Sequence, residues 1–256
     1  MTTQLEVLFA PAEFMALNQR DLSQTVCVVF DVLRATTSMV TALANGATAL
    51  VPVSEIADAI DHRRKNPGVL LAGERNGLRI LGAQAGGIDF DLGNSPREFV
   101  AEKIRGRTIV ITTTNGTRAL QACARAKTVW IGSFLNLSAV AREIQQAQTK
   151  RVLIVCSGTM EEASFEDTLG AGALCDLLWP SFGSGVVADS SHIAREIFLR
   201  HADDLLGAMK FARNGRRLLS MPELRDDVAF ALRRDVYDLV ALMNSQGRIR
   251  QVAEVK

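Results

Sequence analysis

Short apolar runs rich in β-branched residues recur along the chain, and each run is apolar throughout rather than at every second position. The clearest runs lie at 26–30, 49–53, 108–111, 128–131 and 152–156. Continuous apolarity of this kind is typical of strands that are buried on both faces. We therefore predict a sheet that is covered by helices on both sides.

Alanine-rich stretches with helical character separate these runs. We predict helices at 35–45, 117–126, 137–146 and 167–179, so that strands and helices alternate along the chain. This alternation is typical of the α/β fold class.

Three segments share one plan, in which an apolar strand is followed by a short polar turn and then by a helix. Their turns contain Asp31, Thr112 and Ser157. Because ligands bind beyond the carboxyl ends of strands in open α/β sheets, we expect these three turns to face one crevice. The similarity of the segments also suggests repeated units.

Two regions depart from this plan. Residues 70–95 contain six glycines, and so long a loop in a compact chain is usually either functional or disordered. After Ala188 the sequence is mainly helical and charged, and we assign no chemistry to it. The segment GSGVVA at 183–188 is predicted to be a loop, because no strand pattern precedes it.

The bulk composition limits the kinds of partner. Apolar residues make up 48% of the 256 residues, which is enough for a substantial core, and the formal net charge is only +1. So small a charge gives no general attraction to nucleic acid or to an anionic membrane, and any anion binding must be local.

The sequence also favours a cytoplasmic protein. No run of about 18 apolar residues is present, and the N-terminal residues lack the basic region of a signal peptide. We expect Cys27, Cys123 and Cys175 to be buried and reduced, since they fall within apolar strand or helix patterns.

A hydroxyl-rich turn, TTTNGT at 112–117, follows one predicted strand and precedes a helix. Free N–H groups at a helix start, together with hydroxyl groups, can bind the oxygens of an anion. Within this turn we assign substrate binding to Thr113, Thr114, Asn115 and Gly116. Arg118 adds a guanidinium that can bind phosphate or sulfonate. The alternative is an ordinary helix cap, although a cap needs only one such residue.

The motif DVLRATT at 31–37 places an acid at a strand end and an arginine three residues later. Asp31 is a candidate metal ligand and also a candidate nucleophile that forms an aspartyl-phosphate. Arg34 can hold an acidic substrate through its planar guanidinium. An exposed Asp–Arg pair in a loop explains this motif equally well.

The motif SFEDTLGAG at 164–172 puts two adjacent carboxylates, Glu166 and Asp167, at a helix start. Together with Glu74 they supply the hard oxygen ligands that Mg²⁺ prefers. The attraction between acids and a helix N-terminus is an equal alternative. The small residues that follow suggest a close approach of backbone or ligand.

Several phosphatase chemistries are excluded by the residues at key positions. Cys156 has Glu162 six positions later, where a cysteinyl-phosphate loop needs an arginine. Leu33 stands where haloacid-type phosphatases have a second aspartate. The histidines at positions 62, 192 and 201 show no zinc-like spacing, and we expect them to be surface or helix-packing residues.

The chain resembles the 2-phosphosulfolactate phosphatase family in a series of ordered motifs. These are DVLRATTSMVTALANGA, LAGERNG, FDLGNSP, TIVITTTNGTRA, IGSFLN and CSGTMEEASFEDTLGAGA. The match covers about 26–178, with weaker agreement at DDVAFALRRDVYDLV. Ordered motifs at plausible spacings are far more specific than any one of them alone.

The resemblance implies a three-layer α/β/α protein made of two similar, intertwined halves around β-sheets. We expect one unit over 1–256, with subdomains at approximately 1–105 plus the C-terminal helices and at 106–190. It also implies Mg²⁺-dependent hydrolysis of 2-phospho-3-sulfolactate to 3-sulfolactate and phosphate, a step in coenzyme M biosynthesis. The expected partner is a small acidic phosphorylated substrate, not nucleic acid or a membrane. Apolar faces on the C-terminal helices are compatible with a homo-oligomer.

The positions that match the family motifs are Asp31, Arg34, Thr36, Glu74, Arg75, Asn94, Ser95, Thr113, Asn115, Gly116, Ser133, Ser157, Glu166 and Asp167. We assign catalysis to Asp31, Arg34, Glu166 and Asp167, and Mg²⁺ binding to Asp31, Glu74, Glu166 and Asp167. The other matching positions are assigned to substrate binding, together with Thr114 and Arg118. Either Asp31 or a metal-bound water attacks phosphorus.

Three alternatives stay open at this point. A protein of the same fold can act on another small acidic phosphate monoester, and a non-catalytic module can bind an acidic metabolite without turnover. The third alternative is a thiol hydrolase built on Cys156, for which the sequence identifies no histidine partner.

Overall fold

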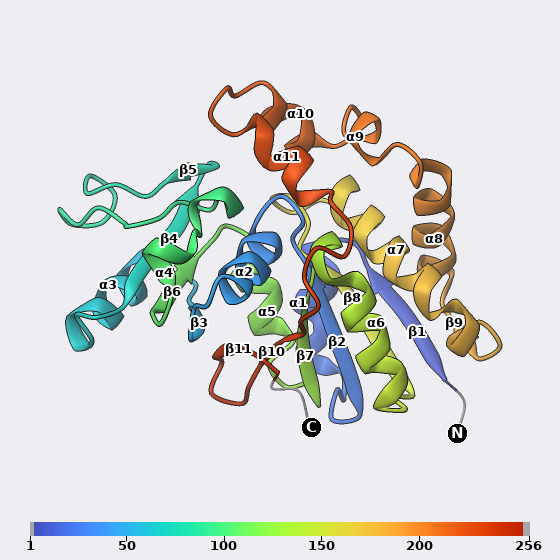
Figure 1. Cartoon of the computed structure of the whole chain (residues 1–256). Coiled ribbons are helices and arrows are strands. Elements are labelled where there is room, and N and C mark those ends of the chain that lie inside the picture. The colour runs from blue at the N-terminus through green and yellow to red at the C-terminus, as the bar shows by residue number, and fades with distance from the viewer. Residues whose placement is uncertain (1–2, 253–256) are drawn as a thin grey trace.

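The computed structural model describes residues 3–252 as one large sheet with helices packed against it (Figure 1). Across the sheet the strands follow the order β5-β4-β6-β3-β11-β10-β7-β2-β8-β1-β9. The strands are β1 Gln4–Leu8, β2 Thr25–Phe30, β3 Ala49–Pro52, β4 Leu70–Arg75, β5 Leu78–Arg79, β6 Thr108–Thr112, β7 Thr128–Gly132, β8 Arg151–Cys156, β9 Val186–Val187, β10 Ala241–Met243 and β11 Ile249–Gln251. The helices are α1 Pro11–Met15, α2 Ala35–Ala44, α3 Ile56–Lys65, α4 Ala101–Ile104, α5 Gly116–Ala122, α6 Leu137–Gln146, α7 Phe165–Phe182, α8 Asp189–His201, α9 Leu205–Ala208, α10 Arg213–Leu219 and α11 Arg225–Ala231.

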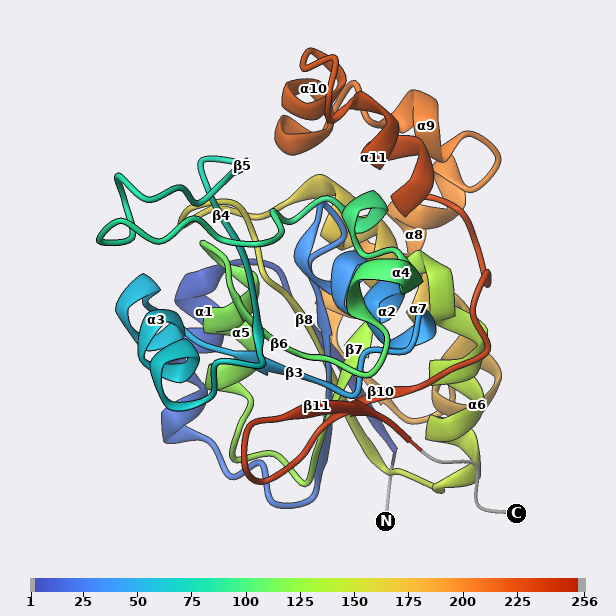
Figure 2. The same cartoon turned by 60° about the vertical axis from the view of Figure 1, so that its left-hand side comes forward.

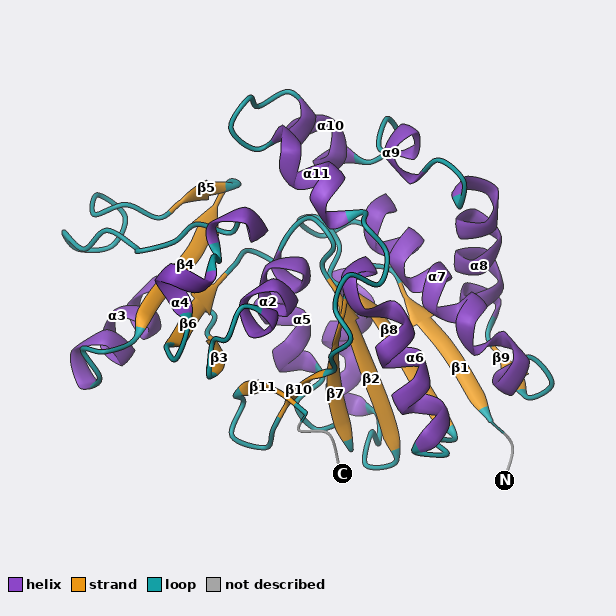
Figure 3. Ribbon diagram, in the orientation of Figure 1, coloured by secondary structure: helices purple, strands orange, loops and turns teal. Residues whose placement is uncertain are grey.

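The sheet contains two parallel blocks that are joined by an antiparallel hairpin (Figure 3). One block holds β1, β2, β7, β8 and β9, and the other holds β3, β4 and β6. In the β10–β11 hairpin, β10 pairs with β7 and β11 pairs with β3, which connects the blocks. The chain therefore crosses between the blocks after β2 and again after β6. The subdomain bounds expected from the sequence stay a prediction.

Helices cover both faces of the first block. The side chains of Val26, Val28 and Phe30 in β2 belong to the core cluster that includes residues of α6, α7 and α8. The side chains of Cys27 and Val29 belong to the cluster that includes residues of α1, α2 and α5. The predicted burial of this strand on both faces is confirmed, and so is the three-layer α/β/α fold.

Helix α2 packs between the two blocks (Figure 2). Its cluster contains Met39 and Val40 of the helix, residues of β2, and also Ile109 and Ile111 of β6. Helix α3 covers the outer face of the second block, where Ile60 packs in a cluster with β6 residues. One shared core thus fixes the ends of β2 and β6 relative to each other.

Most predicted elements are present in the structure. The predicted strands at 26–30, 49–53, 108–111, 128–131 and 152–156 correspond to β2, β3, β6, β7 and β8. The predicted helices at 35–45, 117–126, 137–146 and 167–179 correspond to α2, α5, α6 and α7.

The long loop predicted over residues 70–95 was wrong for its first part, because residues 70–79 form the β4–β5 hairpin. Asn76 and Gly77 make its two-residue turn with φ values of 56° and 76°. Two positive φ angles define the turn that best joins twisted antiparallel strands, and Asn-Gly is its preferred sequence. The hairpin brings Glu74 to the carboxyl end of β6.

Two further expectations about the C-terminal part need correction. The segment predicted as a loop at 183–188 contains β9, which pairs with the edge strand β1. The helical tail ends at Ala231, and the chain then supplies the β10–β11 hairpin. All three strands are short, and each pairs with a strand from a distant part of the chain, which no local pattern reveals.

No helix within residues 3–252 is long and apolar enough to cross a membrane.

The small residues in α7 allow close packing of backbone rather than access of a ligand. A Cβ at Gly172 would lie 2.1 Å from the Ala194 carbonyl oxygen of α8, and one at Gly170 would lie 2.8 Å from Phe30. The close approach expected from the GAGA sequence is therefore an approach of helix α8 and strand β2.

We expect Gly172→Ala to lower the free energy of unfolding by about 1–3 kcal/mol, because overpacking outweighs the gain in helix propensity. The measurement is a urea denaturation midpoint. Gly68→Ala is the matched control, since a Cβ there meets no atom within 4 Å. A Gly172→Ala protein as stable as the unsubstituted chain would contradict this packing.

Candidate active site

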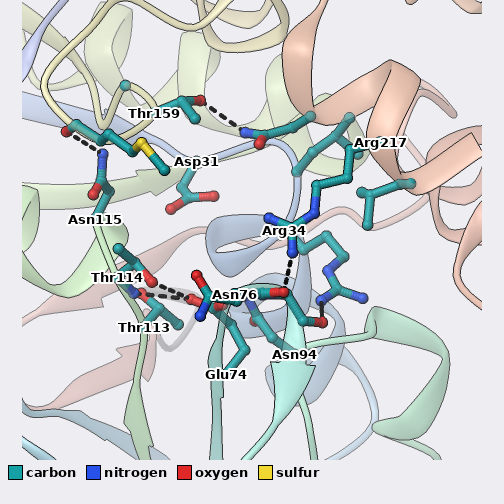
Figure 4. A pocket seen from close by; sticks show the side chains of 16 residues that line it. Asp31, Arg34, Glu74, Asn76, Asn94, Thr113, Thr114, Asn115, Thr159 and Arg217 are labelled. Carbon is teal, nitrogen blue, oxygen red and sulfur yellow. Dashed lines mark hydrogen bonds between the residues drawn. The ribbon is translucent and has the colours of Figure 1, made fainter. Parts of the chain in front are cut away.

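The turns after β2, β6 and β8 line one pocket with a cavity volume of about 110 Å³ (Figure 4). The β4–β5 turn and helix α10 complete its wall. The lining residues are Asp31, Leu33, Arg34, Glu74, Asn76, Gly77, Asn94, Thr113, Thr114, Asn115, Gly158, Thr159, Met160, Asn214, Arg217 and Leu218. The prediction that these three turns face one crevice is confirmed, although Thr112 and Ser157 themselves are buried outside the lining.

Asp31, at the end of β2, points its carboxylate into this pocket (Figure 4). Its Oδ1 accepts a hydrogen bond from the Ala35 N–H at 3.0 Å, and its own N–H donates to Thr36 Oγ1 at 2.9 Å. A Cβ at Gly116 would lie only 2.6 Å from Asp31 Oδ2. The start of α2 therefore orients Asp31, and Gly116 leaves the space that its carboxylate needs.

The pKa of Asp31 is raised to about 6. Burial is the main cause, and the negative charges of Glu74 and Glu166 add to it, while the hydrogen bond from Ala35 acts in the opposite direction. A carboxyl group with this pKa is mostly ionised at neutral pH and can still take up a proton. Asp31 thus has the properties of a reactive acid rather than of an exposed loop residue.

Asp167, in the first turn of α7, uses both carboxylate oxygens to accept hydrogen bonds. Oδ1 accepts from the Val32 N–H at 2.8 Å, and Oδ2 accepts from the Ser157 hydroxyl at 3.1 Å and the Gly158 N–H at 3.2 Å. Burial, together with the charges of Asp31 and Glu166, raises the pKa of Asp167 well above its usual range. Asp167 ties the turn after β2 to the turn after β8.

Glu166 is buried next to Asp167, and only one of its two carboxylate oxygens has a hydrogen-bond partner among residues 3–252. Its Oε1 accepts a hydrogen bond from the Asn214 amide at 2.8 Å, whereas Oε2 is buried and has no partner among residues 3–252. Burial raises the pKa of Glu166. A buried carboxylate oxygen without a partner is costly, so Glu166 is suited to a ligand that supplies positive charge or a proton.

Glu74 connects two of the turns that line the pocket. Its Oε1 accepts hydrogen bonds from the N–H and the hydroxyl of Thr114, both at 2.9 Å, and its Oε2 accepts from the Gly77 N–H at 2.7 Å. The TTTNGT turn is therefore held against the β4–β5 turn by one carboxylate.

The four acids predicted to bind Mg²⁺ are not equally available. No group of three or more His, Cys, Asp or Glu side chains in the described part of the chain is arranged to hold a metal ion. Glu74 and Asp167 use both oxygens within the protein, whereas Asp31 faces the pocket and Glu166 keeps an unpartnered oxygen.

Asn115 supplies a further oxygen atom that could bind a metal ion. Its amide nitrogen donates to the carbonyls of Ser157 at 3.2 Å and Met160 at 2.9 Å, which leaves Oδ1 buried and without a partner in the described structure. Proteins usually bind Mg²⁺ through one or two carboxylates and through oxygens of the substrate phosphate. The oxygens of Asp31, Glu166 and Asn115 therefore fit this ion in their chemistry.

Arg34 is held in place on the opposite wall of the pocket. Its Nη1 donates to Asp227 Oδ2 at 2.8 Å, and its Nη2 donates to the Gly77 carbonyl at 2.6 Å. The other oxygen of Asp227 accepts a hydrogen bond from the Ser95 hydroxyl at 2.6 Å. Both members of the ion pair are buried, so the direction of the guanidinium depends on Asp227.

The residues assigned to substrate binding from the sequence fall into two groups. Those that line the pocket are Asn94, Thr113, Thr114 and Asn115. Those that lie outside its lining are Thr36, Arg75, Ser95, Gly116, Arg118, Ser133 and Ser157.

Hydrogen bonds within the protein account for several of these outer residues. Arg75 donates to the Ser54 carbonyl and to the Thr112 hydroxyl, and Arg118 pairs with Glu161. Ser133 is fully buried and caps the turn after β7. The guanidinium groups of both arginines thus have partners within the protein, and neither arginine lines the pocket.

Sequence reasoning missed the residues that the C-terminal helices contribute. Asn214, Arg217 and Leu218 of α10 line the pocket, and Asp227 of α11 orients Arg34. Adjacent acids at a helix start, as at 226–227, look the same as ordinary helix-start acids. Only the three-dimensional position of Asp227 distinguishes it.

The thiol-hydrolase alternative is not supported by the environment of Cys156. The side chain is completely buried, and burial raises the pKa of its thiol well above the usual value. No histidine among residues 3–252 lines the pocket. The predicted burial of Cys27, Cys123 and Cys175 is confirmed, and all three are free thiols.

Comparison with known proteins supports the resemblance noted in the sequence. A profile of the family described as 2-phosphosulpholactate phosphatase matches residues 14–246. A curated protein from Caldanaerobacter subterraneus subsp. tengcongensis is 41% identical over 89% of this chain and 91% of its own. The corresponding values are 37%, 86% and 89% for a protein from Caldicellulosiruptor saccharolyticus, and 39%, 85% and 88% for one from Thermotoga maritima. All three bear the name "Probable 2-phosphosulfolactate phosphatase".

We expect Asp227→Ala to lower the free energy of unfolding by about 3–5 kcal/mol, because it leaves the buried Arg34 charge without its partner. The measurement is a urea denaturation curve. Asp226→Ala, at a neighbouring side chain that is 61% exposed, is the matched control and should change stability by less than about 0.5 kcal/mol. Equal effects of the two substitutions would show that the buried pair has no special role.

Proposed function

We propose that this chain, which belongs to the 2-phosphosulfolactate phosphatase family and is therefore a phosphoric monoester hydrolase, acts on 2-phospho-3-sulfolactate. The products are 3-sulfolactate and inorganic phosphate, and the reaction serves coenzyme M biosynthesis in the cytoplasm. One observation carries the proposal: the buried Asp31 carboxylate and the Arg34 guanidinium line the same pocket. A substrate with a phosphate and further anionic groups needs an acid that can hold a cation beside the phosphate and a guanidinium that binds the other anionic groups.

In this proposal Asp31 and Glu166 would hold Mg²⁺, and Asn115 Oδ1 would be a further oxygen ligand. When bound, the ion neutralises charge on the phosphoryl group. The support for it is chemical: Glu166 Oε2 and Asn115 Oδ1 are buried without partners among the described residues, and burial with nearby negative charge raises the pKa of Asp31.

The chain's own residues then bind the substrate and position the attacking water. The Asp31 carboxylate, which faces the pocket, accepts a hydrogen bond from that water and takes up its proton. The water oxygen forms the new bond to phosphorus while the bond from phosphorus to the ester oxygen breaks. The ester oxygen takes up the proton that the water gave to Asp31 and becomes the hydroxyl of 3-sulfolactate.

Substrate orientation is the role of the opposite wall. Arg34 is fixed by Asp227 and Gly77, and its remaining N–H groups are available to the carboxylate of the substrate. Fixed donors are effective because their reorganisation cost is met during folding. Thr113 lines the pocket and can donate its hydroxyl to the phosphate, whereas Thr114 donates both its N–H and its hydroxyl to Glu74.

We expect the purified protein to release phosphate from 2-phospho-3-sulfolactate when Mg²⁺ is present and to lose this activity with excess EDTA. The measurement is phosphate release from a panel that also contains phosphoglycolate and 2-phospholactate. Asp31→Asn should lower kcat by at least about 100-fold, since it removes the charge that faces the reaction.

The matched control is Asp61→Asn, at an exposed position on α3, which should leave the rate unchanged. Release of phosphate from no member of the panel would favour a binding protein without turnover. Full activity in EDTA would refute the dependence on Mg²⁺. Full activity of Asp31→Asn would refute the role of that carboxylate.

A further inference from the structure

Two guanidinium groups meet at the Asn76–Gly77 turn on one wall of the pocket (Figure 4). Arg34 donates to the Gly77 carbonyl at 2.6 Å, and Arg217 donates to the Asn76 carbonyl. A Cβ built on Gly77 would lie 3.5 Å from Arg217 Nη2 and 3.9 Å from Arg34 Nη2. Two positive charges are thus brought close together by residues about 180 positions apart in the chain.

The two charges differ in how the protein compensates them. Arg34 is 4% exposed and pairs with the buried Asp227. Arg217 lies at the exposed rim, and no carboxylate within residues 3–252 forms an ion pair with it. Arg217 therefore lacks the ion pair that compensates Arg34, and a ligand with a second anionic group would relieve the repulsion between the two guanidinium groups.

Helix α10 holds Arg217 in this position. On the same helix, Asn214 donates to Glu166 at 2.8 Å and Leu218 is buried in the main core cluster. Gly215 packs so tightly that a Cβ there would lie 2.9 Å from the Met209 carbonyl oxygen. The backbone that carries Arg217 is therefore fixed relative to Glu166 and to the main core.

We propose that Arg217 binds the sulfonate of the substrate and sets the preference of the enzyme for a sulfonated phosphoacid. This inference rests on the proposed function, because it assigns one group of that substrate to that pocket. A guanidinium offers a planar fork of N–H donors, which matches the oxygens of a sulfonate. Arg75 and Arg118, which the sequence analysis assigned to substrate binding, lie outside the pocket lining.

The order of groups on the substrate agrees with the depth of the two arginines. The carboxylate is bonded to the same carbon as the phosphate ester, whereas the sulfonate is bonded to the next carbon. With the phosphate beside Asp31, the carboxylate lies nearer and meets the buried Arg34. The sulfonate lies farther out and meets the exposed Arg217.

The test compares two substrates that differ only in the sulfonate, 2-phospho-3-sulfolactate and 2-phospholactate. We expect Arg217→Gln to lower kcat/KM for the sulfonated substrate by about 10- to 100-fold, which is the usual size of one lost charged hydrogen-bonding contact. The kcat/KM for 2-phospholactate should change by less than about twofold, because this substrate has no sulfonate for Arg217 to bind. Arg217→Lys keeps the charge without the fork and should give an intermediate loss.

Arg216→Gln is the matched control. This neighbour is exposed, lies outside the pocket lining and donates to the Lys210 carbonyl. Its replacement should therefore leave kcat/KM unchanged for both substrates. Calorimetric binding of 3-sulfolactate and of lactate gives a second readout that does not need turnover. Arg217→Gln should weaken only the binding of 3-sulfolactate, and the urea midpoint of each variant reports whether it is folded.

The outcomes separate this inference from the proposed function. No phosphate release from either substrate by the unsubstituted protein would contradict the proposed function, while the binding comparison would still decide the role of Arg217. Equal losses on both substrates, or no loss on the sulfonated one, would overturn the inference and leave the phosphatase proposal intact. If Arg217→Gln does not fold, the same comparison is made with Arg217→Lys, and an equal effect on both substrates overturns the inference.

Discussion

The burial of several carboxylates near one another is the constraint on which this structure depends. Asp31 follows strand β2, and Glu166 and Asp167 lie in the first turn of α7. Burial, together with the charges of Asp31 and Glu166, raises the pKa of Asp167. Like charges out of water are costly unless donors or cations compensate them. The protein directs N–H and hydroxyl donors at Asp167 but leaves an oxygen of Glu166 without a partner among the described residues. Our account assigns the missing compensation to a cation, which would also bind the anionic phosphoryl group.

On the opposite wall of the pocket the buried charge is positive, and an acid compensates it. Arg34 is buried, and Asp227 from the C-terminal helices neutralises it, so the tail of the chain completes a site that begins on β2. The same tail provides the β10–β11 hairpin that joins the two blocks of the sheet. Stability and substrate orientation are therefore coupled: an interaction that anchors the tail also directs a guanidinium into the pocket. A pocket with an acidic wall and a basic wall suits a small molecule that carries a phosphate and other anions.

Much of the fold could be predicted because its signals are local. Continuous apolar runs identified the buried strands β2, β3, β6, β7 and β8, and the polar turns after three of them marked the pocket. The β4–β5 hairpin also had a local signal, the Asn76–Gly77 pair, which the glycine-rich surroundings of residues 70–95 obscured. Arg217 and Asp227 had no such signal, because charged residues on a helix usually face solvent. Their roles follow only from the position of α10 and α11 over the strand ends, which tertiary packing decides.

The most direct test of the central claim is a crystal structure of the protein with Mg²⁺, orthovanadate and 3-sulfolactate. Our account predicts that the cation contacts Asp31 and Glu166 and that the vanadate lies beside Asp31. It also predicts the carboxylate of 3-sulfolactate on Arg34 and the sulfonate on Arg217. A cation bound away from Asp31, or ligands bound outside this pocket, would contradict the account, because the two charged walls would then serve no common ligand.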